Sequence, residues 1–234
     1  MTNTLHRFGD AESFRDDFVI FAIASKGTND KDSLPKLRRF LEIAAEYKPV
    51  NLGDARHGGA LRPSKSMNPM AHWNRDIQPD FAAVIAGLDH PTTCAAVFDN
   101  KVAAEDFVSR IRKEDLGLSI NISTSIDGAE QCCHHACIPR HSVGYSLGFE
   151  GSVEKLPSSQ VMTLSTMCGH GMVSHSLAKK MVDWVKEGRR TPEQAVSYMA
   201  RFCSCGVFNP ARAKRVLAEA VSQGAISQGA PNAK

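Results

Sequence analysis

The stretch Phe18 to Ser25, FVIFAIAS, is a continuous apolar run that ends in the polar residues Lys26 to Asp30. Such a short run, bounded by a turn, predicts a buried strand. A helix is expected to begin at Ser33, because serine can cap a helix and Pro35 is tolerated in the first turn. The next strand is predicted at 49–52. The chain therefore opens with a strand, a helix and a strand.

The same alternation continues toward the middle of the chain. Helices are predicted over 80–88, 102–111 and 127–136, and strands over 93–98, 118–123 and 141–147. Strands separated by helices are typical of a mostly parallel sheet with helices on both faces. The predicted fold class is therefore α/β, with a mostly parallel sheet, flanking helices and a helical C-terminal segment.

The last third carries the clearest helix signals. A strand is predicted over 161–166, followed by a helix whose apolar residues share one face and which stops at Gly188. Thr191, Pro192 and Gln194 form a capping-box pattern at the start of another helix, and Asn209-Pro210 begins the last one. We expect a polar N-terminal arm over 1–17, one domain over 18–221 with C-terminal helices from 171, and a flexible tail over 222–234.

Composition restricts the class of protein. The chain has 234 residues, of which 42% are hydrophobic and 23% charged, and a net charge of only +3. This small excess gives no reason to expect nucleic acid or a membrane as partner. The N-terminus lacks the pattern of a secretory signal, and no window is apolar enough for a membrane span. We therefore expect a cytoplasmic protein, in which seven cysteines favour metal ligation or catalysis over disulfides.

The most reactive-looking motif is Met167-Cys168-Gly169-His170-Gly171. With a strand before it and a helix after it, Cys168 would lie at a helix N-terminus, where the partial positive charge favours the thiolate. Beside it, His170 could transfer a proton or bind a metal. Cys168 is therefore a candidate catalytic residue, and His170 is a second one.

Cys203 and Cys205 form a Cys-x-Cys pair between two well-signalled helices, 35 residues after Cys168. Thiolates held so close repel each other, so the pair suggests a neutralising cation. Cys168, Cys203 and Cys205 could hold an iron–sulfur cluster with one accessible iron. The same cysteines with His170 could instead complete a tetrahedral zinc site. A packed helix end without metal remains the other interpretation.

The segment Cys132-Cys133-His134-His135-Ala136-Cys137 is a second dense cluster. On a helix, the cysteines at 133 and 137 share one face, and the residues at 132 and 135 share another. Either pair could bind metal, but a buried small residue and a surface cap explain them equally well. Whether this cluster joins the first site is left open, and Cys94 is expected in the core.

The segment from Arg56 to Asp76 has no sustained periodicity and carries many cations. A loop this long is typical of a lid or a binding loop, although a solvated connection is equally compatible with it. Arginine matches the geometry of carboxylate and phosphate groups. Arg56 and His57, together with Lys26, are therefore candidate substrate-binding residues for an anionic molecule, and Arg62, Lys65, His72, Asn74 and Arg75 add further donors.

The five residues Met167 to Gly171 resemble the catalytic-cysteine segment of proline racemases, in which two cysteines act as opposed acid and base. The resemblance implies a thiol acid/base role for Cys168, with Cys203 or Cys205 as its partner. The dinucleotide fingerprint, the phosphate loop, the HExxH helix and the GxSxG elbow are all missing from the sequence.

Three functions follow from these patterns. The leading one is an enzyme with an iron–sulfur cluster that performs lyase-type chemistry, such as elimination or hydration, on a small polar, anionic substrate. The second is a metal-free cysteine isomerase or transferase. The third is a non-catalytic protein in which zinc ties the C-terminal helices together. A small-molecule substrate is the expected partner, and the sequence is compatible with a homo-oligomer.

Overall fold

The computed structural model describes residues 5–61, 79–145 and 148–228. The strands are β1 (Phe18–Ile23), β2 (Asn51–Asp54), β3 (Gly58–Gly59), β4 (Thr93–Phe98) and β5 (Ser119–Ser123). The helices are α1 (Ser33–Glu46), α3 (Phe81–Ala86), α4 (Lys101–Glu114), α5 (Ile126–His135), α6 (Ser159–Ser165), α7 (His175–Lys186), α8 (Pro192–Ala200) and α9 (Pro210–Gln228), with short 3-10 turns at Glu12–Phe14 and Val153–Lys155.

The five strands form one sheet in the order β3-β2-β4-β1-β5, and every neighbouring pair is antiparallel. In the register of the central pair, Phe18 lies opposite Phe98 and Ile23 lies opposite Thr93. The prediction of a mostly parallel sheet is therefore wrong. The α/β alternation itself is present, and so is the helical C-terminal segment.

The order of the strands explains why the prediction failed. β1 and β2, which α1 connects, are parallel to each other, but β4 lies between them. β4 and β5, which α4 connects, are likewise parallel, with β1 between them. Each β-α-β unit thus leaves a gap that a strand of the other unit fills, which is the split β-α-β arrangement. Helices alternate with strands along the chain, yet all neighbours in the sheet run in opposite directions.

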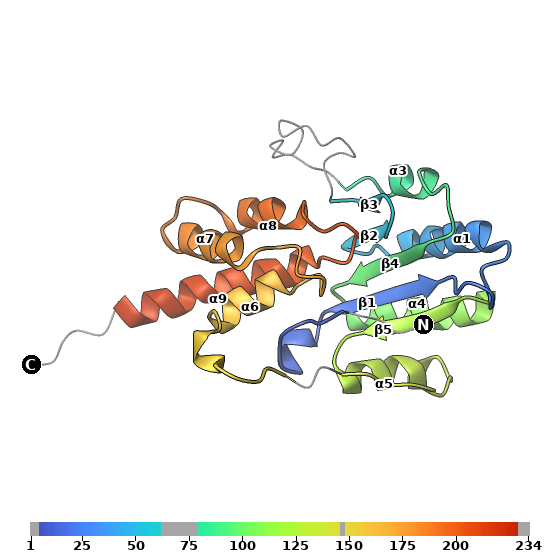
Figure 1. Ribbon diagram of the computed structural model, residues 1–234, viewed down its shortest axis with the longest axis horizontal. Coiled ribbons are helices and arrows are strands. Elements are labelled where there is room, and N and C mark those ends of the chain that lie inside the picture. Colours follow the sequence, from blue (N-terminus) through green and yellow to red (C-terminus); the bar gives the residue numbers. More distant parts are fainter. Residues whose placement is uncertain (1–4, 62–78, 146–147, 229–234) are drawn as a thin grey trace, which may run out of the picture.

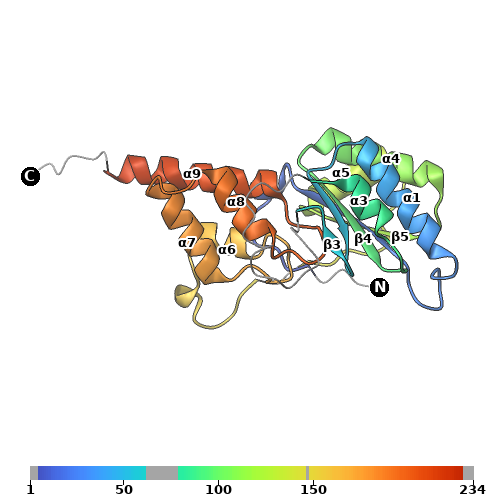
Figure 2. The same ribbon diagram turned by 90° about the horizontal axis from the view of Figure 1, so that it is seen from above.

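Helices α1, α3, α4 and α5 lie together against the sheet, whereas α6 to α9 form a separate group beyond one end of it (Figure 1, Figure 2). Alternate residues of β1 enter the two cores: Phe18, Ile20 and Ala22 pack with α1, α4 and α5, whereas Val19, Phe21 and Ile23 pack with α6 to α9. Because both faces are covered, all six residues of β1 are buried. This explains why the strand is a continuous apolar run rather than an alternating one.

Two predicted strands are absent from the described part of the chain. Residues 161–166 were expected to be extended, but Ser159–Ser165 forms α6, in which the five residues from Val161 onward are all buried. A helix buried on every side has the same apolar run as a buried strand, so the pattern does not separate them. Residues 141–145 form no strand, and Ser146 and Leu147 lie outside the described residues.

Several local predictions are confirmed. Strands appear at Phe18–Ile23, Thr93–Phe98 and Ser119–Ser123, and the helix predicted from Ser33 spans Ser33–Glu46. The capping box at the start of α8 is complete: the Thr191 side chain accepts from the Gln194 backbone, and the Gln194 side chain accepts from the Thr191 backbone. Within the described ranges, no helix combines the length and the apolar character needed to cross a membrane.

Candidate functional site

The motif Met167 to Gly171 lies in the connection between α6 and α7. Cys168 follows the C-terminus of α6, and α7 begins only at His175, after the capping residue Ser174. The expectation that Cys168 lies at a helix N-terminus is therefore wrong. The end of α6 carries partial negative charge, which opposes a thiolate rather than favouring it.

The segment Cys203 to Gly206 connects α8 to α9, and the structure brings it against the first motif. The Sγ of Cys205 lies 3.2 Å from the Nδ1 of His170. The thiols of Cys168 and Cys203 hydrogen-bond to each other, and the thiol of Cys203 also hydrogen-bonds to that of Cys205. His170 completes the ring through a further hydrogen bond with Cys168. Three thiols and one imidazole thus form one connected cluster, which we call the thiol cluster.

The thiol cluster is buried at one end and open at the other. Cys168 is fully buried, and Cys203 and Cys205 are 2% and 8% exposed, whereas His170 is exposed. The buried Sγ of Cys203 also accepts a hydrogen bond from the backbone N–H of Phe208, at 3.3 Å. A reactant would therefore approach from the side of His170 and Cys205.

The environment keeps the two innermost thiols protonated. The hydrogen bond with Cys203, followed by burial, raises the pKa of Cys168 to about 12, although His170 acts in the opposite direction. For Cys203, the hydrogen bond with Cys168 lowers the pKa, but the bond with Cys205 and burial outweigh it and raise the pKa to about 11. These thiols are therefore poor nucleophiles at neutral pH unless a cation stabilises their thiolates.

The cluster as it stands is not a finished metal site. Among the described residues, no group of three or more histidine, cysteine and acidic side chains has the arrangement needed to hold a metal ion. Metal binding also requires that the thiols lose their protons. In the structure these protons are engaged in the hydrogen bonds between Cys168, Cys203 and Cys205. The donors are close together, so loading would require side-chain rotation together with deprotonation.

The N-terminal arm runs along the first motif. The N–H of His6 donates to the carbonyl of Gly169 at 3.1 Å, and the N–H of Phe8 donates to the Oγ1 of Thr166 at 3.0 Å. Gly169 has a φ of +73°, and a Cβ atom there would lie 2.7 Å from the Cβ of Leu5. Glycine is therefore required at this position, both for the backbone conformation and for the contact with the arm.

A buried ionic group lies next to this contact. The Asp17 carboxylate accepts hydrogen bonds from Arg7, from the Nη1 of Arg212 at 2.9 Å and from the Nδ2 of Asn209 at 2.8 Å. The side chains of Arg7, Asp17 and Arg212 are at most 3% exposed. Sequence reasoning missed this group, because Arg7 and Arg212 are 205 positions apart and its members belong to no motif.

The loop of Cys205 also contacts the edge of the sheet. Gly206 packs so tightly against the hairpin formed by β2 and β3 that a Cβ atom at Gly59 would lie 2.3 Å from its Cα. Arg56 and His57 belong to the turn of that hairpin. The buried Asp54 accepts from the backbone N–H groups of both residues, each at 2.8 Å. The turn is therefore held beside the cysteine loop.

The three predicted substrate-binding residues differ in their surroundings. The His57 ring is paired with Asp54 at 3.2 Å and with Asp89 at 3.1 Å, whereas the side chains of Arg56 and Lys26 are exposed. Within the described ranges, none of the three hydrogen-bonds to the thiol cluster. The other cations expected in this loop, Arg62, Lys65, His72 and Arg75, and Asn74 with them, lie outside the described residues.

The second cysteine cluster lies on the opposite face of the sheet. Cys132 belongs to the core around α1, α4 and α5, where burial raises its pKa to about 12. Cys137 is exposed, and the Nε2 of His135 lies 3.2 Å from Asp106. The two cysteine clusters therefore do not meet. Cys94 is buried in β4, as expected for a core residue.

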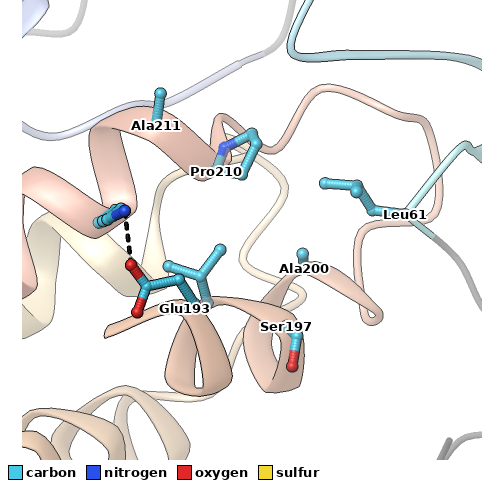
Figure 3. A pocket seen from close by; sticks show the side chains of 8 residues that line it. Leu61, Glu193, Ser197, Ala200, Pro210 and Ala211 are labelled. Carbon is cyan, nitrogen blue, oxygen red and sulfur yellow. Dashed lines mark ion pairs between the residues drawn. The ribbon is translucent and has the colours of Figure 1, made fainter. Parts of the chain in front are cut away.

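A cavity of about 260 Å³ opens beside the cysteine loop, between α8 and α9 (Figure 3). Its walls are mostly apolar, and the Glu193–Lys214 ion pair forms one side. The lining residues are Leu61, Glu193, Val196, Ser197, Ala200, Pro210, Ala211 and Lys214. Ala200 and Pro210 flank the Cys203 to Gly206 segment in the sequence, yet none of the cysteines lines the cavity. The apolar walls of the cavity suit an apolar ligand group.

Comparison with known proteins gives no further guide: no family model, no curated protein and no solved structure matches this chain. The function is therefore inferred from the site alone.

Proposed function

We propose that the protein is a cytoplasmic enzyme with a metal–thiolate centre held by Cys168, Cys203 and Cys205. The observation that carries this proposal is the convergence of three thiols and the His170 imidazole from two separate inter-helix connections. Cysteine and histidine are the donors that iron–sulfur clusters and zinc use most. The centre that we favour is an iron–sulfur cluster with one iron free of cysteine, which supplies a Lewis acid for lyase-type chemistry.

The raised pKa values favour a metal centre over metal-free cysteine catalysis. Thiols whose pKa values are raised to about 12 and about 11 are almost wholly protonated at pH 7. A cysteine acid/base isomerase needs one of its cysteines as a thiolate in the resting enzyme, and a transferase needs a nucleophilic one. A divalent cation reverses this balance, because a coordinating thiol loses its proton outright.

The open end of the cluster supports a catalytic role. His170 is exposed and lies within hydrogen-bond distance of Cys205, so its ring faces solvent while it remains next to the centre. Arg56 and His57 lie on the hairpin that packs against Gly206, and Lys26 is exposed after β1. We assign them to binding of a small polar, anionic substrate.

One contact favours zinc as a second candidate. Because His170 approaches Cys205 directly, the cluster offers three sulfur donors and one nitrogen donor, the set of a closed structural zinc site. In that case the protein would be non-catalytic, and the metal would tie the segment between α6 and α7 to the segment between α8 and α9. The two candidates can be told apart by composition: the iron–sulfur centre contains iron and acid-labile sulfide, whereas the zinc site contains zinc and no sulfide.

Metal and sulfide analysis of anaerobically purified protein tests the proposal. Stoichiometric iron and sulfide with visible absorption supports the iron–sulfur enzyme, stoichiometric zinc without sulfide supports the structural site, and neither metal overturns both. Single cysteine-to-serine variants at 168, 203 and 205 should each lose the metal. Cys133→Ser is the matched control, because Cys133 is partly exposed on the opposite face of the sheet.

A further inference from the structure

We propose that a polar cavity beside α4, remote from the thiol cluster, binds a small molecule that carries a phosphate group. The cavity has a volume of about 420 Å³, which lies within the range of small-molecule sites. It is found where α4 contacts the C-terminal ends of α1 and α5, and it belongs to the other of the two cores. The lining residues are Tyr47, Asp106, Ser109, Arg110, Arg112, Lys113, His135, Ala136 and Cys137.

Three cations of α4 line the cavity, and two of them have no acidic partner. Arg110 forms an ion pair with Glu114, which also pairs with Arg39. Among the described residues, neither Arg112 nor Lys113 forms an ion pair, and both side chains are exposed. The helix dipole favours cations in the last turn of α4, which explains their charge. It does not explain the polar cavity that they line.

A buried hydroxyl in the wall of the cavity lacks a hydrogen bond. Among the described residues, the buried Oγ of Ser109 has no partner. A buried hydroxyl without a hydrogen bond is costly, because it has given up its bond to water and gained none in return. Ser109 lies three and four positions before Arg112 and Lys113, so the three residues are neighbours on one side of α4. An anion held by the two cations can therefore accept the missing bond from Ser109.

The carboxylate in the lining is already engaged. Among the described residues that line the cavity, Asp106 is the one carboxylate, and its Oδ1 lies 3.2 Å from the Nε2 of His135. The side chains of Asp106 and His135 are 50% and 46% exposed, so solvent and salt screen the repulsion between this carboxylate and an anion. The cations therefore dominate the charge of the cavity.

Charge and geometry favour a phosphate over a carboxylate as the ligand group. A phosphate monoester carries about −1.5 to −2 charges at pH 7, which matches the two cations without an acidic partner. The guanidinium fork of Arg112 fits two phosphate oxygens, Lys113 acts as a point charge, and a third oxygen remains for Ser109. The volume of the cavity leaves room for an organic part beside the ring of Tyr47.

The experiment is a titration of ¹⁵N-labelled protein with inorganic phosphate and with phenyl phosphate at constant ionic strength, followed by two-dimensional NMR. Saturable shifts are expected for the amide groups of 109–113 and 135–137, the two segments that line the cavity. Sodium chloride at the same ionic strength controls for unspecific salt effects. Sodium benzoate, a carboxylate with the same ring, controls for the ligand group.

Four variants test the residues of the site. Ser109→Ala should bind phenyl phosphate about tenfold more weakly, because it loses a hydrogen bond to a charged group. Arg112→Gln and Lys113→Gln should each bind about fivefold more weakly, as expected for one charge about 4 Å away in water. Lys101→Gln is the matched control: Lys101 begins α4 and does not line the cavity, so its loss should change binding by less than about twofold.

The stability of the ligand-free protein separates a binding role of Ser109 from a structural one. Ser109→Ala should unfold at the same urea concentration as the wild-type protein or at a higher one, because the substitution removes a hydroxyl that has no partner. A clear loss of stability together with unchanged phosphate binding would show that the hydroxyl serves the fold, and would overturn the proposal.

The remaining outcomes are equally decisive. The absence of saturable shifts with both phosphate compounds overturns the proposal, and so do shifts that chloride reproduces. Equal weakening by Lys101→Gln and Arg112→Gln also overturns it, because the effect would then reflect net charge alone. Tighter binding of benzoate than of phenyl phosphate overturns phosphate as the ligand group.

Discussion

Replacing Asp17 by asparagine should destabilise the protein strongly. The substitution preserves the shape of the side chain but removes the carboxylate that, among the described residues, hydrogen-bonds to Arg7, Arg212 and Asn209. Removing one partner of a buried ion pair costs about 3–5 kcal/mol, because the other charge stays buried. Here two cations lose their partner. For a chain of this length, about 3–5 kcal/mol corresponds to a fall in Tm of roughly 6–20 °C.

The assay is urea denaturation of metal-free protein, followed by far-UV circular dichroism. Asp16→Asn is the matched control: Asp16 is the sequence neighbour, its side chain is 38% exposed, and it forms ion pairs with Arg15 and Arg215 at the surface. Such surface pairs contribute about 0–1 kcal/mol. The double variant Arg7→Met/Asp17→Asn should lose less stability than Asp17→Asn alone. If the Asp17 and Asp16 variants differ by less than about 1 kcal/mol, the account of a buried charge group is wrong.

Three further predictions concern packing, capping and pH. Gly59→Ala should cost about 1–3 kcal/mol in urea denaturation, because the new Cβ would lie 2.3 Å from the Gly206 Cα, whereas Gly144→Ala, with no atom nearby, should not. Thr191→Ala should cost about 1 kcal/mol through loss of the capping box, and Ser158→Ala, whose side chain makes no capping bond, should cost little; equal losses would contradict this. In metal-free protein the raised pKa of Cys168 stabilises the fold fully at pH values below the ordinary thiol pKa of 9.0. This contribution to stability is lost as the pH rises toward the raised pKa of about 12. The stability difference between the wild-type protein and Cys168→Ala should therefore shrink over this range, and a difference that grows would refute the raised pKa.

The sequence predicted local structure well and strand partners poorly. The capping box at Thr191 and the strand at Phe18–Ile23 are set by residues within a few positions of each other. The direction of neighbouring strands depends instead on which unit supplies the next strand. The insertion of β4 between β1 and β2 leaves no trace in the α/β alternation, so a parallel sheet was the natural but wrong expectation.

The candidate site shows the same division. The two cysteine segments were identified because cysteine, histidine and glycine cluster in them, and the structure places them together. The chemical environment of Cys168 was mispredicted, because α6 was mistaken for a strand and the helix dipole was assigned the wrong sign. The group of Arg7, Asp17 and Arg212 could not be predicted, since isolated charged residues are usually solvated and only the folded chain buries these three.

X-ray absorption at the metal edge tests the central claim most directly. For protein loaded anaerobically, the account predicts iron with sulfur neighbours at about 2.3 Å, close to the metal–thiolate distance known for zinc. Cys203→Ser should lose this sulfur shell, because the thiol of Cys203 is the one that hydrogen-bonds to both other cysteines of the thiol cluster. A metal surrounded only by oxygen and nitrogen, or a sulfur shell that survives in Cys203→Ser, would contradict a centre built on Cys168, Cys203 and Cys205.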